Sequence, residues 1–109
     1  KKSKLELQQQ EMQLENTKLV KQKEDDLLLL DVNQLEKELA EYTNIMVLRQ
    51  KNDVHAENQY NSGITSLNER LDSYEDLLSA QNTYLQTLAS YTLAKYKVYI
   101  RQIELKSNN

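Results

Sequence analysis

The chain has 109 residues, with 14 Lys and Arg against 17 Asp and Glu, a single Gly, and no Pro, Cys, Trp or Phe. Turns and strand connections draw on Gly and Pro, so this composition excludes β-sandwiches, loop-rich α/β folds and glycine-rich phosphate loops. The longest apolar run, at residues 27–30, is far shorter than the ~20 residues of a membrane-spanning helix, and the net charge of −3 argues against a nucleic-acid partner. The composition therefore predicts an all-α protein made of long helices.

The first predicted helix covers about residues 3–60. From residue 28 onward its apolar side chains recur in steps of four and three, which is the spacing of a coiled-coil seam. This seam consists of Leu28, Val32, Leu35, Leu39, Tyr42 and Met46. Before residue 25 the heptad pattern weakens, and the sequence leaves open whether the helix continues through Asp25 and Asp26.

One cluster of helix-breaking residues interrupts the helical pattern. It consists of Asn61, Ser62 and Gly63, followed by Ile64 and Thr65. Asn and Gly tolerate the left-handed conformation that ends a helix. Ser66 and Glu69 then match the S-x-x-E capping box that begins one. The sequence therefore predicts a turn over residues 61–65, at which the chain doubles back into a long antiparallel helical hairpin.

The second predicted helix covers about residues 66–106. Its longest apolar series advances by about 3.6 residues per step, which is the period of a nearly straight helix. The series is Leu67, Leu71, Tyr74, Leu78, Gln81, Leu85, Ala89, Leu93, Tyr96, Ile100 and Ile103. A second apolar line, at residues 77, 84, 91 and 98, runs beside it, so the apolar arc is wide and predicts more than one neighbouring helix.

A hairpin that turns near Gly63 pairs residues whose numbers sum to about 126. This register sets Leu78 opposite Leu48, Leu85 opposite Glu41 and Tyr42, Leu88 opposite Leu39, and Tyr96 opposite Leu30. It also predicts the charge pairs Arg101–Asp25, Lys95–Asp31, Arg70–Glu57, and Arg49 with Glu75 and Asp76. Exposed ion pairs contribute only ~0.2–1 kcal/mol each, so we expect them to select the register rather than to stabilise the hairpin.

Two helices alone cannot enclose a core, because each seam is covered on one side only. We therefore expect either self-association or membership of a larger protein. The stretch before about residue 20 has no counterpart in the second helix, which favours the larger protein.

The turn and the second helix carry motifs in a characteristic order. They are Tyr60-Asn61-Ser62-Gly63-Ile64-Thr65-Ser66-Leu67, then Leu71-Asp72-Ser73, then Leu78-Ser79-Ala80-Gln81-Asn82-Thr83-Tyr84-Leu85. From about Ala56 to Leu105 the chain resembles the TolC-type outer membrane efflux protein family. That family has Tyr-x-x-Gly-hydrophobic-x-Ser/Thr at its turn, then a Leu-Asp pair and an Ala-Gln-x-x-hydrophobic-Leu stretch.

The resemblance implies a piece of a homotrimeric channel in the outer membrane of Gram-negative bacteria. Such channels export drugs, metal ions or proteins after docking to a periplasmic adaptor (membrane fusion) protein and an inner-membrane transporter. The chain lacks the family's β-strand segments and first repeat, so it corresponds to the helical hairpin of the C-terminal repeat, in the periplasmic α-helical barrel. In the family Val often precedes the turn Gly, and Ser62 occupies that place here.

The resemblance also implies an adaptor-docking tip. This tip consists of Asn61, Ser62, Gly63, Ile64, Thr65 and Ser66, of which Gly63, Ile64 and Ser66 match the family's motif. An acidic patch follows, made of Glu69, Asp72, Glu75 and Asp76, with Asp72 at the family's Leu-Asp position. This patch is either part of the docking surface or a set of charges favoured by the helix dipole, and the two roles are compatible.

The sequence predicts no enzyme and no cofactor. Ser/His/Asp and Cys/His sets, paired catalytic carboxylates and phosphate loops cannot be assembled from it. His55 is the only histidine, so we expect no metal site. The alternative to the channel is a self-associating helical-hairpin scaffold or adaptor protein without a transport role, which would dimerise into a four-helix bundle.

Overall fold

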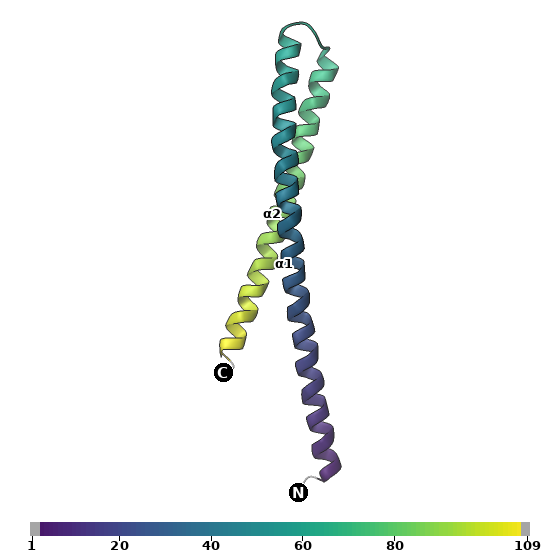
Figure 1. Ribbon diagram of the computed structural model, residues 1–109, viewed down its shortest axis with the longest axis vertical. Coiled ribbons are helices and arrows are strands. Elements are labelled where there is room, and N and C mark those ends of the chain that lie inside the picture. The colour runs from purple at the N-terminus through teal and green to yellow at the C-terminus, as the bar shows by residue number, and fades with distance from the viewer. Residues whose placement is uncertain (1–2, 108–109) are drawn as a thin grey trace. The chain divides into compact units, whose positions relative to one another are not determined.

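A computed structural model describes residues 3–107 of the chain. Helix α1 (Lys4–Asn61) and helix α2 (Leu67–Ser107) are joined by the short connection at residues 62–66 (Figure 1). Strands are absent from this described part, so the predicted all-α hairpin is confirmed. Helix α1 runs without a break through Asp25 and Asp26, which the sequence had left open.

Local sequence explains why both helices are long. Neither contains Pro or Gly, and both are rich in Leu, Gln, Glu and Lys, which have high helix propensity. The first turn of α1 is capped by Ser3, whose Oγ accepts a hydrogen bond from the backbone N–H of Glu6 at 3.2 Å. Such a cap satisfies one of the backbone donors that a helix N-terminus leaves without an intrahelical partner.

The chain divides into two compact units. We call Asn33–Leu93, which contains the turn, the tip unit. We call the remainder, described over residues 3–32 and 94–107, the terminal unit. Each unit contains a segment of α1 and a segment of α2.

In the tip unit, α1 contacts α2 through the predicted seam. Leu35, Leu39, Tyr42 and Met46 are all half-buried, so this part of the seam is confirmed. The line then continues to buried Asp53. On α2 the covered positions also alternate in steps of three and four. This line consists of Arg70, Ser73, Leu77, Ala80, Tyr84, Thr87 and Tyr91, and Gln81, Thr83 and Leu88 beside it are also half-buried. Both helices therefore meet along coiled-coil-type seams.

The longest apolar series of α2 does not face α1, which corrects the sequence-based pairing. Leu78 and Leu48 were expected to meet, but they remain 44% and 56% exposed. Leu85 and Leu93 are also exposed. The large apolar members of this series are exposed all along α2, from Leu67 to Ile103, so the series lies on a different face of the helix from the contact. Contact between two helices that wrap around each other follows a line with a spacing of about 3.5 residues. The contact instead uses the second apolar line.

The seam of α2 alternates small and large side chains. Buried Leu77 and Thr87 flank the half-buried pair Ala80 and Tyr84. Small side chains at the contact allow two helix axes to approach each other, because the interaxial distance depends on the residues between them. The expected pairing of Leu88 with Leu39 is compatible with the structure, since both are half-buried.

The terminal unit has a smaller contact. Leu28 and Val32 of α1 and Val98 of α2 are half-buried, and Ala94 is only 3% exposed. Tyr96 and Leu30 are exposed, so their expected pairing is wrong for the same reason as that of Leu78 and Leu48. Residues 4–24 of α1 are exposed along their whole length.

Candidate functional site

The turn between the helices is built around Gly63. Its φ is +76°, in the left-handed region that favours glycine. The N–H of Gly63 donates to the carbonyl of Tyr60 at 3.0 Å, and the N–H of Ile64 donates to the carbonyl of Gln59 at 2.9 Å. These two hydrogen bonds define a Schellman motif, which satisfies carbonyls that the end of α1 would otherwise leave unpaired.

Helix α2 begins at a side-chain cap on the far side of the turn. The Ser66 Oγ accepts a hydrogen bond from the N–H of Glu69 at 3.2 Å, and its carbonyl accepts one from the N–H of Arg70 at 3.1 Å. Ser66 therefore occupies the N-cap position that the S-x-x-E pattern indicates. The Schellman motif and this cap together fix where each helix stops and starts.

The apex of the turn carries an exposed apolar side chain. Ile64 is 71% exposed, more than any other large apolar side chain in the described residues. After a Schellman glycine an apolar residue frequently packs back on the last helical turn. Here the matching position on α1 is the polar residue Gln59. The adjacent Thr65 Oγ1 is enclosed and lacks a hydrogen-bond partner.

An ion-pair cluster holds the helices together just below the turn. Arg70 of α2 donates a hydrogen bond from its guanidinium to Asp53 Oδ1 of α1. It also lies 3.9 Å from Glu57 Oε2, as the predicted register required, and 6.0 Å from the ring centroid of Tyr74. The charge pairing from sequence identified Glu57 but missed Asp53. The continued seam, which reaches position 53 in heptad steps from Met46, was the signal that could have found it.

The structure brings together three of the four predicted acidic residues. Glu69, Asp72 and Asp76 line one shallow groove on the tip unit, with Arg49 and Asn52 from α1. Glu75 does not line this groove. The expected ion pairs of Arg49 with Glu75 and Asp76 are absent from the described chain, although Arg49 and Asp76 share the groove. The groove therefore offers carboxylates beside a single guanidinium.

Residues 61–66, the predicted docking tip, form one continuous piece of surface around the Schellman turn. Asn61 is the last residue of α1, and Asn61, Ser62 and Gly63 are exposed together with Ile64. Thr65 is half-buried beneath them, and Ser66 caps α2. This surface combines one large apolar side chain with small polar ones.

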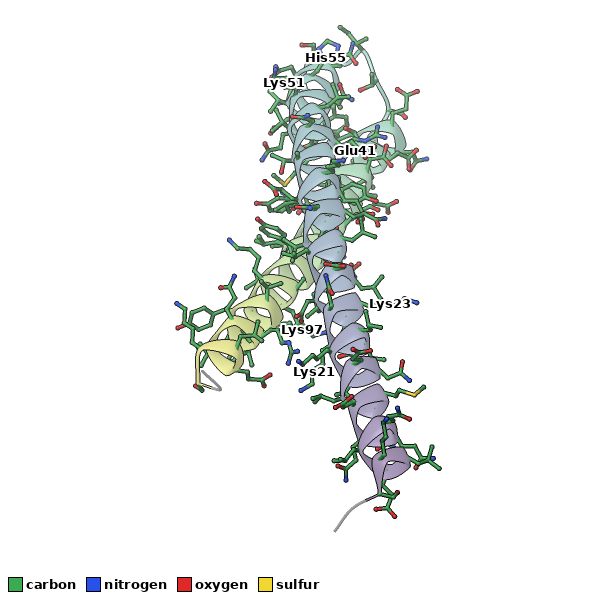
Figure 2. All side chains as sticks on the ribbon, turned by 60° about the horizontal axis from the view of Figure 1, so that its bottom comes forward. Lys21, Lys23, Glu41, Lys51, His55 and Lys97 are labelled. Atoms are coloured by element: carbon green, nitrogen blue, oxygen red, sulfur yellow. The ribbon has the colours of Figure 1, made fainter. Side chains whose placement is uncertain are left out.

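Few other titratable side chains lie near the turn. Figure 2 shows His55 and Lys51 at the end of α1 nearest the turn, with Glu41 farther along the same helix. Across residues 3–107, no three His, Asp or Glu side chains are grouped so that they could hold a metal ion. Neither helix, over its described length, has a stretch apolar enough to cross a lipid bilayer.

The terminal unit contains a second interhelical ion pair. Arg101 Nε donates to Asp25 Oδ1 at 2.7 Å, which confirms the predicted pair, and Arg101 also lies 3.2 Å from Glu104 Oε2. The hydrogen bond to Asp25 raises the pKa of the Arg101 guanidinium above its ordinary value, against the opposite effect of burial. Arg101 therefore stays charged at physiological pH.

The two interhelical arginines thus mark one antiparallel register, one in each unit.

Comparison of the chain with models of protein families, with curated proteins and with solved structures finds no match.

Proposed function

We propose that this hairpin forms part of the wall of a trimeric outer membrane efflux or secretion channel, in its periplasmic portion. The turn at residues 61–66 would dock a periplasmic adaptor protein, which in turn joins an inner-membrane transporter. The activity is mechanical rather than enzymatic. Adaptor contact at the turn would change how adjacent hairpins pack and thereby open the channel.

The exposed apolar series of α2 is the observation that carries this proposal. We define the α2 outer face as Leu67, Leu71, Tyr74, Leu78, Leu85 and Leu93, all of which are exposed in the hairpin. Covering the remaining exposed part of each such side chain would stabilise an assembly by about 1 kcal/mol. In a tubular wall, a helix of the next hairpin covers this face, whereas α1 covers only the opposite side of α2.

The charge distribution along α2 supports the same proposal. Residues 77–94 contain no charged side chain, although 28% of the whole chain is charged. Depletion of charge is typical of the core of a protein–protein interface. A helix that had one partner and otherwise faced water would carry charges on its outer side, as α1 does at Glu41 and Lys51.

The tip supports the docking part of the proposal. Ile64 is held at the apex by the Schellman motif and is exposed there, so a partner could bury it without any rearrangement of the turn. The carboxylates of Glu69, Asp72 and Asp76 lie in the groove beside the turn and would favour a basic segment on the adaptor.

Binding to an adaptor tests this proposal directly. The helical hairpin of a periplasmic adaptor protein from the same organism is titrated against the chain, and we expect saturable binding that Ile64→Asp abolishes. Val54→Asp, at an exposed apolar position of α1 outside the tip, serves as the control and should bind normally. Equal loss of binding in both variants, or no binding at all, would contradict the proposal.

The gene itself separates the channel from the scaffold alternative. A channel gene encodes β-strand segments and a second, related hairpin around these residues. A reading frame limited to this hairpin would instead support the self-associating scaffold, for which the α2 outer face would be the contact surface.

A further inference from the structure

The end of α2 within the terminal unit, at residues 94–107, has two opposite faces. One face lies against α1. There Ala94 is buried, Val98 is half-buried, and Arg101 donates a hydrogen bond to Asp25 of α1. The other face is exposed, and we call it the tyrosine–isoleucine face. It consists of Tyr96, Tyr99, Ile100 and Ile103. With 3.6 residues per turn it is centred about half a turn from the contact, so it points away from α1.

The two tyrosines on this face are neighbours. The ring centroids of Tyr96 and Tyr99 lie 6.5 Å apart with their planes tilted by 34°, and the two residues remain 58% and 57% exposed. Tyrosine has an apolar ring and a polar hydroxyl group, and it is enriched where a lipid bilayer meets water. Tyrosines beside isoleucines therefore suit the boundary between lipid headgroups and acyl chains.

Exposed lysines border the tyrosine–isoleucine face on both sides. The helical period places Lys95 and Lys106 along one edge and Lys97 along the other. The one acidic residue of this segment, Glu104, lies 3.2 Å from the Arg101 guanidinium, which compensates its charge. Four cations against one carboxylate give the segment a net charge of +3. The apolar surface therefore has a positively charged rim, which is complementary to an anionic surface.

The identity of these cations favours a lipid surface over an acidic protein. Protein interfaces are depleted in lysine and enriched in arginine, and the one arginine of this segment is turned to α1. On a bilayer, lysine lays its apolar stem along the surface and keeps its ammonium group among the headgroups. Residues 77–94 differ, because they contain no charged side chain and therefore suit a protein neighbour.

We propose that the tyrosine–isoleucine face binds the surface of an anionic lipid bilayer. The helix lies along this surface, with Ile100 and Ile103 at the boundary of the acyl chains and the lysines among the lipid phosphates. The inference does not rest on the proposed channel, which uses the tip and the α2 outer face as far as Leu93.

Sedimentation of the full chain with vesicles tests this inference. Vesicles of equal parts phosphatidylcholine and phosphatidylglycerol should bind the chain at least about tenfold more tightly than vesicles of phosphatidylcholine alone. Added salt should weaken this binding, because it screens the attraction. Lys97→Gln should weaken it about fivefold, while Lys23→Gln, which removes the same charge from α1, should change it less than about twofold.

Two apolar residues of similar exposure on opposite faces test which face binds. Ile103 is 43% exposed on the tyrosine–isoleucine face, and Leu105 is 48% exposed and lines a groove with Leu28 of α1. Ile103→Ser should weaken vesicle binding at least about fivefold and Leu105→Ser less than about twofold. Circular dichroism verifies that both variants stay helical.

Three results would overturn the inference. They are equal binding to both kinds of vesicle, equal effects of Ile103→Ser and Leu105→Ser, and binding to soluble polyglutamate without binding to vesicles, which would indicate an acidic protein partner instead. Adaptor binding through Ile64 is measured without lipid, so the proposed channel stands or fails separately.

Discussion

Substitution of Gly63 by Val is expected to destabilise the hairpin through the backbone alone. Gly63 has a φ of +76°, and a Cβ placed there would meet no atom within 4 Å. Steric conflict with the rest of the molecule is therefore absent, and the cost is that of a β-branched residue in the left-handed region. This cost is on the order of 1–2 kcal/mol of the free energy of unfolding.

Urea unfolding followed by circular dichroism measures this free energy. Gly63→Asn should cost less than Gly63→Val, because Asn adopts the left-handed conformation more readily. Ser62→Val is the matched control, since Ser62 does not have a positive φ. If Ser62→Val destabilised the chain as much as Gly63→Val, or if Gly63→Val had no effect, the assignment of the strained position to Gly63 would be refuted.

Three further predictions concern the tip unit and are measured by urea unfolding at concentrations where the chain is monomeric. Asp53→Ala leaves the largely covered Arg70 guanidinium without its closest partner and should lower the free energy of unfolding by about 1–3 kcal/mol. Glu57 is exposed, so Glu57→Ala should lower it by less than ~0.5 kcal/mol. Equal losses in the two variants would contradict the role of Asp53. Leu77→Ala should lower the free energy of unfolding by about 2–3 kcal/mol and Leu78→Ala by less than about 1 kcal/mol, because only Leu77 is buried. A larger loss for Leu78→Ala would show that the contact with α1 lies on the other face of α2. Ser66→Ala should cost about 1 kcal/mol through loss of the N-cap, and an unchanged free energy would show that the cap is dispensable.

The position of the turn could be predicted because its signals are local. A glycine that ends one helix and a Ser that begins the next act through backbone geometry within a few residues, so their effect does not depend on the partner helix. The structure shows the same spacing at the start of α1, where the Ser3 Oγ accepts a hydrogen bond from the N–H of Glu6. The long-range pair Arg101–Asp25 followed from the turn position alone.

The face of α2 could not be predicted by counting apolar residues. The 3.6-residue series contains more leucines than the line through Leu77 and Tyr84, yet contact with a single partner selects the latter because of its 3.5-residue spacing. Burial of Asp53 was missed for a related reason. A carboxylate interrupts an apolar seam, and only its pairing with Arg70 across the hairpin makes that position favourable.

The reversal of the chain at Gly63 is tested most directly by a distance between the helices. Spin labels at Leu48 and Leu78, both exposed in the tip unit, are measured by double electron–electron resonance in a sample diluted with unlabelled chain. The hairpin brings the two helix axes to about 8–10 Å, so the label separation should stay below about 30 Å. A single helix through the turn would separate the same labels by about 45 Å, and that result would contradict the hairpin and the functions built on it.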